Sequence, residues 1–108
     1  MPNLNENFNA AAQWQPTFRI LGDLTRLRVL SAIHFEGPFA STVGELARHT
    51  ELHHATVSAA LRSMEQSGTV TSRRNGRTIL YAIADERVHH LLHVIGTSHR
   101  AANSGVDQ

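Results

Sequence analysis

A chain of 108 residues with a formal charge of +1 has room for one small domain, and because such a domain buries a modest fraction of its surface, a partner subunit is expected to stabilise it. The absence of cysteine excludes disulfide bonds, thiolate metal sites and cysteine nucleophiles. No apolar run reaches the ~20 residues that a bilayer span requires, and no secretory pattern opens the chain, so we expect a cytoplasmic protein.

Two helices are predicted in the N-terminal part of the chain. Residues 1–9 are polar and rich in asparagine, and we expect them to form a flexible N-terminal arm. Residues 10–21 are predicted to form the first helix, because Trp14 and Phe18 have the spacing of one apolar face. A second helix is predicted over residues 23–35, where leucine and isoleucine recur at helical spacing.

Residues 42–81 have the pattern of a winged helix-turn-helix, a mainly α fold with a β-hairpin wing. Thr42 and Glu45 make a T-x-x-E capping box, which starts a short helix. The chain turns at residues 50–52, and a second helix follows with one apolar face and one outward face. The apolar face carries Ala55, Val57, Leu61 and Met64, and the outward face, the candidate recognition surface, carries Ser58, Ala59 and Arg62.

A hairpin is predicted after this second helix. Gly68 ends the helix, and Asn75-Gly76 is the dipeptide that most favours a two-residue type I′ turn. Three arginines lie near the tip. Together with Arg62 they give this stretch four positive charges, and Glu65 is the one negative charge there. The three are Arg73, Arg74 and Arg77. This local positive charge suits phosphate contacts, although a solvated turn would carry the same residues.

The last predicted helix runs from Asp85 to about Arg100 and carries half of the eight histidines. Asp85, His89 and His93 form a stripe along the edge of its apolar face. In an antiparallel pair of these helices from two subunits, His99 would approach the partner's Asp85 or the partner's His89. The sequence therefore predicts an intersubunit metal site. Nitrogen and oxygen donors without sulfur suit Zn(II), Ni(II) or Co(II).

Another interpretation of these histidines stays open. The helix histidines, His90 among them, could be solvated, with His99 packed at the dimer interface. The remaining histidines, His34, His49 and His53, are predicted to be surface or half-buried residues rather than ligands.

Two segments resemble the ArsR/SmtB family of metal-responsive winged-helix repressors. They are L-G-D-L-T-R-L-R-V-L at residues 21–30 and R-R-N-G-R-T-I-L-Y at residues 73–81, on either side of the helix-turn-helix. The resemblance runs from about Phe18 to His99, and Leu24 stands where the family motif has proline. It implies a homodimer, held by the first and last helices, whose recognition helices enter successive major grooves of a palindromic operator. Inducer binding normally weakens DNA binding in this family.

The family's recognition helix often has the pattern S-Q-S-x-V-S-H-H-L, which matches residues 53–61 here. His54 and Ser58 share one face and can hydrogen-bond to a base edge or a phosphate, whereas alanine side chains can contact a thymine methyl group. Arginines of the helix and the wing are expected to contact phosphates or the minor groove. The candidate DNA-contacting residues are His54, Ala55, Ser58, Ala59, Arg62, Arg73, Arg74 and Arg77.

The resemblance also locates a metal site and shows where this chain departs from it. Zinc and nickel sensors of the family place D-x-H at the start of the last helix and H-x-x-H or H-x-x-E at its end, from opposite subunits. Asp85 matches the aspartate, but Arg87 replaces the next histidine, and Ser98 and Ala101 occupy the later pair. The family histidine that links ligands to the recognition helix is Ala60 here, so a signal needs another route. We therefore expect a rearranged site made of Asp85, His89, His93 and the partner's His99.

The sequence as a whole predicts one domain over residues 10–102 with a flexible tail at 103–108. Its expected function is that of a homodimeric DNA-binding repressor of metal-homeostasis genes that responds to Ni(II) or Zn(II). The alternative is a regulator of the same fold that responds to another ligand or to a partner protein. An enzyme is not expected, because the chain has no H-E-x-x-H helix, phosphate-binding glycine loop or nucleophile elbow.

Overall fold

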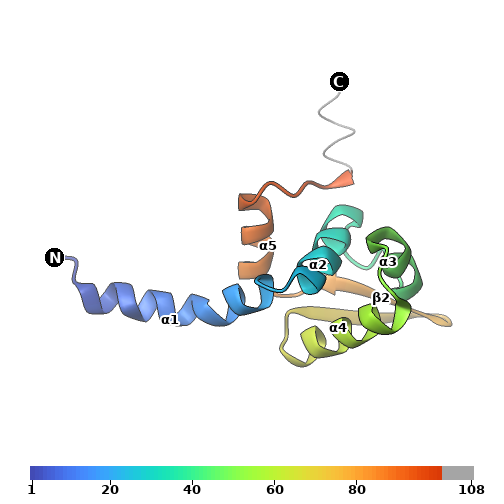
Figure 1. The fold of residues 1–108 in the computed structure, drawn as a ribbon, viewed down its shortest axis with the longest axis horizontal. Coiled ribbons are helices and arrows are strands. Elements are labelled where there is room, and N and C mark those ends of the chain that lie inside the picture. Colours follow the sequence, from blue (N-terminus) through green and yellow to red (C-terminus); the bar gives the residue numbers. More distant parts are fainter. Residues whose placement is uncertain (101–108) are drawn as a thin grey trace, which may run out of the picture.

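The computed structural model describes residues 1–100 and has the architecture of a winged helix-turn-helix (Figure 1). Its elements in chain order are α1 (Leu4–Leu21), α2 (Leu24–Glu36), α3 (Val43–Thr50), α4 (His54–Gln66), β1 (Val70–Asn75), β2 (Thr78–Ile83) and α5 (Glu86–Val94). The expected mainly α fold with a hairpin wing is confirmed. The tail expected at residues 103–108 lies outside the described residues. Within residues 1–100, no helix has the length and apolar character needed to cross a membrane.

Helix α2 lies at the centre of the core. The Asp23 carboxylate caps its N-terminus by accepting a hydrogen bond from the Arg26 backbone N–H at 2.9 Å. Val29, Leu30 and Ile33 are buried along its inner face. Residues from every later element complete this cluster: Leu46, Val57, Leu61, Met64, Val70, Tyr81, Val88 and Leu92. The position of α2 therefore sets the relative positions of the helix-turn-helix, the wing and α5.

The helix-turn-helix is formed by α3 and α4. The Thr42 hydroxyl accepts from the Glu45 N–H at 3.2 Å, and the Glu45 carboxylate accepts from the Thr42 N–H at 2.9 Å, so the predicted capping box is confirmed. Glu51 takes a left-handed conformation with φ 59° and ends α3. One expectation is wrong: Ala55 is exposed rather than buried, because it lies on the same side of α4 as the outward residues.

The wing turn lies one residue later than predicted, which shifts the strand pairing by two residues. Asn75 pairs with Thr78, so the two turn residues are Gly76 and Arg77 rather than Asn75 and Gly76. Gly76 has a φ of 64° and Arg77 keeps a negative φ, which is the sign pattern of a type II′ turn rather than the type I′ turn expected. Because the pairing shifts by two residues, each side chain keeps its face of the hairpin, and Tyr81 stays on the buried side.

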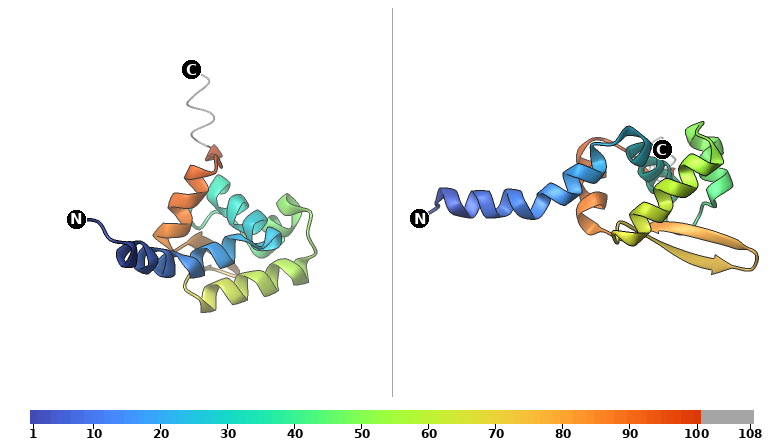
Figure 2. Two further views of the ribbon diagram at one scale, coloured as in Figure 1. Left: turned by 60° about the vertical axis from the view of Figure 1, so that its left-hand side comes forward. Right: turned by 60° about the horizontal axis from the view of Figure 1, so that its bottom comes forward.

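Helix α1 begins earlier than predicted. Asn3 caps it by accepting from the Glu6 N–H at 2.9 Å, so residues 4–9, expected in a flexible arm, form its first turns. The N-terminal half of α1 projects away from the rest of the structure (Figures 1 and 2). Phe8 and Phe18 are about 60% exposed along it. A helix that carries exposed aromatic residues away from the core presents apolar surface to a partner.

Helix α5 ends six residues before the predicted end, at Val94. Gly96, with a φ of 96°, takes a conformation that favours glycine, and the Thr97 N–H closes the turn by donating to the Leu92 carbonyl at 3.0 Å. The expectation of a helix to about Arg100 is therefore wrong. The consequence is that His99 leaves the helix and lies against α2 of the same chain.

The capping box of α3 gives a test of the fold. Thr42→Ala is expected to lower the free energy of unfolding by about 1 kcal/mol, because the Glu45 N–H loses its acceptor. Thr42→Ser keeps the hydroxyl and is the matched control. Urea denaturation followed by circular dichroism measures both variants, and equal losses of stability would show that the hydroxyl is not what stabilises α3.

Candidate metal centre and DNA-binding surface

Four histidines from separate parts of the chain meet between α2 and α5. His34 comes from the last turn of α2, His89 and His93 from α5, and His99 from the segment after α5. His34 is buried, so the expectation of a surface or half-buried residue is wrong. Sequence spacing could not reveal it, since only the packing of α2 on α5 brings it to the other three.

The Nε2 atom of His93 lies close to the Nε2 atoms of the other three histidines of this cluster. It lies 3.3 Å from the Nε2 of His34, 3.1 Å from that of His89 and 3.3 Å from that of His99. One possible ligand nitrogen from each residue falls within 4.8 Å of all the others. His34, His89 and His99 also line a small pocket of about 100 Å³ beside the cluster. Four possible nitrogen donors are thus close enough together that one metal ion could bind them.

Hydrogen bonds on the outer side of the cluster determine two of the imidazole tautomers. His99 Nδ1 lies 2.9 Å from the His34 backbone carbonyl, which can only accept, so Nδ1 carries the proton. The Thr97 hydroxyl donates to the Leu92 carbonyl at 2.9 Å and lies 3.0 Å from His34 Nδ1. Because the hydroxyl has one proton, it satisfies both partners when His34 Nδ1 donates to it. In His34 and His99 the Nε2 lone pair then faces the cluster.

Burial and the neighbouring imidazoles disfavour protonation of two members of the cluster, His34 and His89. The pKa of His34 falls from its ordinary value of 6.5 to about 4, first because burial disfavours the cation and then because His99, His93 and His89 repel it. Burial also lowers the pKa of His89, and the charges of His93 and His99 add to this effect. Neutral imidazoles are the form that ligates metals.

Asp85 does not join the cluster. Its Oδ1 atom accepts from the backbone N–H groups of Arg87 at 2.8 Å and Val88 at 3.4 Å, so it caps the N-terminus of α5. The predicted site combined Asp85 with the partner's His99, whereas His99 here meets His93 of its own chain. The structure thus brings together three of the four predicted ligands, His89, His93 and His99, and His34 lies with them.

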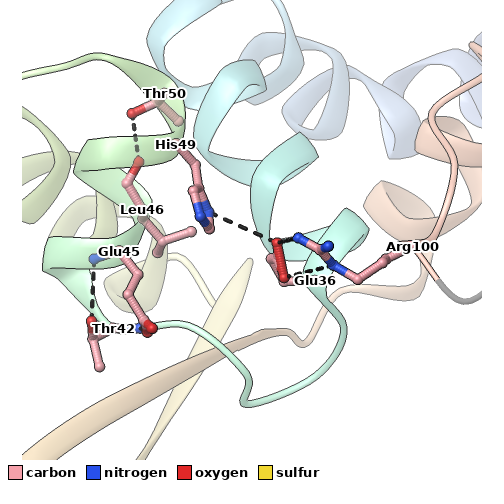
Figure 3. A network of polar contacts seen from close by, with 7 residues as sticks. All are labelled: Glu36, Thr42, Glu45, Leu46, His49, Thr50 and Arg100. Carbon is pink, nitrogen blue, oxygen red and sulfur yellow. Dashed lines mark hydrogen bonds and ion pairs between the residues drawn. The ribbon is translucent and has the colours of Figure 1, made fainter.

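A polar network connects the segment after α5 to the helix-turn-helix (Figure 3). Arg100 donates to both carboxylate oxygens of Glu36, at 2.5 and 3.3 Å, and the same carboxylate lies 3.9 Å from His49 Nδ1 on α3. The hydrogen bond from Arg100 holds the pKa of Glu36 below its ordinary value. Glu36 is two residues from His34, so the last turn of α2 contacts both the histidine cluster and α3.

The candidate DNA-binding residues lie on α4 and the wing. His54, Ala55, Ala59 and Arg62 are exposed and Ser58 is half-buried on α4, while Arg73, Arg74 and Arg77 are exposed on the wing. The Arg73 guanidinium lies 3.8 Å from the centre of the Phe39 ring, so this arginine is held against the body of the protein. Glu65 accepts a hydrogen bond from Ser72 at 2.6 Å, which ties the wing to α4.

Comparison with known proteins identifies the class. Residues 23–78 match the model of the MarR family, from the cap of α2 to the first residue of β2. The HTH-type transcriptional regulator NmtR of Mycobacterium tuberculosis is 33% identical over 91 residues, covering 84% of this chain and 73% of that protein. A probable mercury resistance operon repressor of Streptomyces lividans is 35% identical over 75 residues, covering 69% of this chain and 58% of that protein.

A solved structure agrees with this result. The crystal structure of a predicted DNA-binding transcriptional regulator from E. coli is similar to this chain with a TM-score of 0.76 at 27% identity, covering 86% of this chain and 96% of the other. The fold, the wing and these relatives define a winged-helix transcriptional regulator. By its family match the chain belongs to the MarR family. The matched residues end before α5, so the match does not include three of the four clustered histidines.

The lowered pKa of His34 predicts a pH-dependent stability in the metal-free protein. Between pH 6.5 and about 4 the unfolded chain binds a proton that the folded chain does not, so the free energy of unfolding decreases as the pH falls through this window. Above pH 6.5 the contribution is fully present, and its loss amounts to at most about 3 kcal/mol. Urea denaturation at pH 7 and pH 5 with a chelator present measures it.

The control for this experiment is His34→Gln, which removes the titrating group and is expected to show a weaker pH dependence. NMR titration of the His34 ring in the folded wild-type protein provides a second measurement. An ordinary pKa near 6.5 for that ring would contradict the prediction.

Proposed function

We propose that this protein is a homodimeric transcriptional repressor of the ArsR/SmtB type that binds a palindromic operator and responds to Ni(II) or Zn(II). The observation that carries the proposal is the cluster of four imidazoles, which converges on one point and contacts the same helix that supports the helix-turn-helix. A metal bound there has the means to favour one arrangement of α2, α3 and α5 over another, which is what a metal-dependent change in DNA affinity requires.

The exposed apolar surface supports the dimer. Large apolar side chains remain exposed on α1 and at the end of α5, where the core of a single chain does not cover them. They include Leu4, Phe8, Phe18, Val94 and Ile95. Their position agrees with a dimer formed through the first and last helices, and burying them in a second subunit would remove apolar area from water.

The contacts proposed for DNA divide into two kinds. Residues on the outward face of α4 would contact base edges in the major groove, and arginines of α4 and the wing would contact phosphates or the minor groove. The first kind is His54, Ala55, Ser58 and Ala59, and the second is Arg62, Arg73, Arg74 and Arg77. A dimer would have two such DNA-binding surfaces, one in each subunit, and they would contact the two half-sites of an operator.

The choice of metal follows from the donors. The named function of one relative is mercury resistance, but this chain has no cysteine and so lacks the thiolates that soft ions prefer. Imidazole suits borderline divalent ions such as Zn(II) and Ni(II). We therefore propose a response to one of these ions and the regulation of genes for its homeostasis.

The function is tested by measuring operator binding with and without metal. Purified protein is expected to bind its operator fragment, and one equivalent of Zn(II) or Ni(II) per chain is expected to change the dissociation constant by about 5–150-fold, the usual range of allosteric coupling. Fluorescence anisotropy at fixed ionic strength measures it. An unchanged dissociation constant with either ion, under conditions where DNA is bound, would favour a regulator that responds to another ligand or to a partner protein.

The wing arginines should act through charge. Arg74→Ala and Arg77→Ala are each expected to weaken binding to all DNA sequences and to reduce the slope of log affinity against log salt by about one. Ser58→Ala is expected to change mainly the preference among operator sequences. The control is Arg28→Ala, an exposed arginine on α2. If Arg28→Ala reduces the slope as much as the wing variants do, the wing makes no special contact.

A further inference from the structure

We propose that each chain holds one divalent metal of the Zn(II) class in a tetrahedral site made of the Nε2 atoms of His34, His89, His93 and His99. The site lies within one subunit and needs no residue of the partner. This inference rests on the proposed metal response and narrows it, because it specifies the ligands, the coordination geometry and the number of metals per chain.

The distances support a tetrahedral site. Zinc binds imidazole nitrogen at about 2.0–2.1 Å, so two nitrogens of a tetrahedral site are separated by about 3.3–3.4 Å. The Nε2 of His93 lies 3.1–3.3 Å from the Nε2 of each of the other three imidazoles. One ligand nitrogen from each of the four residues lies within 4.8 Å of the others, and small rotations of exposed side chains such as His89 can shorten the longer separations.

Hydrogen bonding alone does not explain this convergence. With Nδ1 protonated, His34 and His99 each direct an Nε2 lone pair at His93. His93 Nε2 carries at most one proton and cannot form a good hydrogen bond to all three neighbours at once. At least one lone pair therefore faces a nitrogen without a proton between them. A cation at the centre of the cluster would satisfy all four nitrogens.

The outer contacts complete the arrangement of a metal site. Metal-ligating histidines commonly donate their second ring N–H to a carbonyl or another oxygen, which orients the ring and selects its tautomer. His99 donates to the His34 carbonyl at 2.9 Å, and His34 donates to the Thr97 hydroxyl at 3.0 Å. The segment after α5 thus supplies one ligand, His99, and one positioning residue, Thr97.

The chemistry of the donors indicates the ion. Four neutral nitrogens without sulfur disfavour Cu(I), Hg(II) and other soft ions, and the absence of carboxylates disfavours Mg(II) and Ca(II). Zn(II) has no geometric preference from its d electrons and accepts the tetrahedral arrangement that these positions offer. Co(II) serves as its spectroscopic substitute.

The site is tested by titrating the full-length protein with Co(II) and then with Zn(II). We expect one Co(II) per chain with the intense visible absorption of tetrahedral coordination, followed by its loss as Zn(II) displaces Co(II). Heteronuclear NMR of the zinc-bound wild-type protein is expected to show coordination through Nε2 for four imidazoles. A weak six-coordinate spectrum, or half an equivalent of metal per chain, would overturn the inference.

Variants separate this site from the intersubunit site that Asp85 would support. His34→Ala is expected to abolish tetrahedral Co(II) binding, whereas His90→Ala, an exposed histidine of the same helix outside the cluster, is expected to leave it unchanged. Asp85→Asn should also leave it unchanged. The opposite pattern, in which Asp85→Asn removes binding and His34→Ala does not, contradicts the proposal. If His34→Ala does not fold, the Co(II) absorption and NMR spectra of the wild-type protein still show whether the four imidazoles bind the metal.

Thr97 gives a graded test. Thr97→Val removes the hydroxyl that holds the His34 ring and is expected to weaken Zn(II) binding by about 10–100-fold, as loss of an outer contact usually does. Thr97→Ser is expected to restore most of the affinity. Circular dichroism checks that both variants fold. Equal Zn(II) affinity in Thr97→Val and wild-type protein would show that Thr97 does not position His34.

Measuring operator binding by the same variants distinguishes a failure of this inference from a failure of the proposed function. If metal changes operator affinity in His34→Ala as it does in the wild type, the four-imidazole site is wrong and the metal-responsive function stands. If the four imidazoles bind metal and operator affinity does not change, the site stands and the proposed metal response is wrong.

Discussion

The packing of α2 in the core is the contact on which the remaining features depend. Helices α1, α3, α4 and α5 and strand β2 all contact it, and Leu30 and Ile33 are almost completely buried there. The last turn of the same helix presents His34 to α5 and Glu36 to α3. Because packed interiors resist deformation, a displacement of this turn would also shift the side chains that it contacts on α5 and on α3. The proposed metal response therefore has a route to α3 that does not need the recognition-helix histidine replaced by Ala60.

Much of the fold follows from local patterns in the sequence. The capping box at Thr42, the apolar spacing along α4 and the glycine after it predict the helix-turn-helix, because each pattern acts within a few residues. Two predicted helix ends are wrong, although local signals mark the observed ones. Asn3 and Glu6 have the spacing of a helix cap, and Gly96 marks the end of α5, yet the spacing of the histidines suggested that this helix continues.

The candidate metal site shows what local patterns cannot predict. His89 and His93 are four residues apart on one helix, so their shared face is visible in the sequence. His34 is 55 positions before His89 and joins it only because α2 packs on α5. The expectation that His99 reaches another subunit depends on a last helix that continues to about Arg100, whereas α5 ends at Val94. The early end of α5 turns it back to its own chain.

The proposed metal site has all four donors in one chain, which would make metal binding independent of dimer formation. In a site shared by two subunits, dilution that dissociates the dimer also removes half of the ligands, so apparent affinity depends on protein concentration. A site contained in one chain, as proposed for His34, His89, His93 and His99, keeps its ligands when the subunits separate. A newly synthesised chain would thus bind its metal ion before it forms a dimer. Its apparent metal affinity would not fall when the protein concentration in the cell is low.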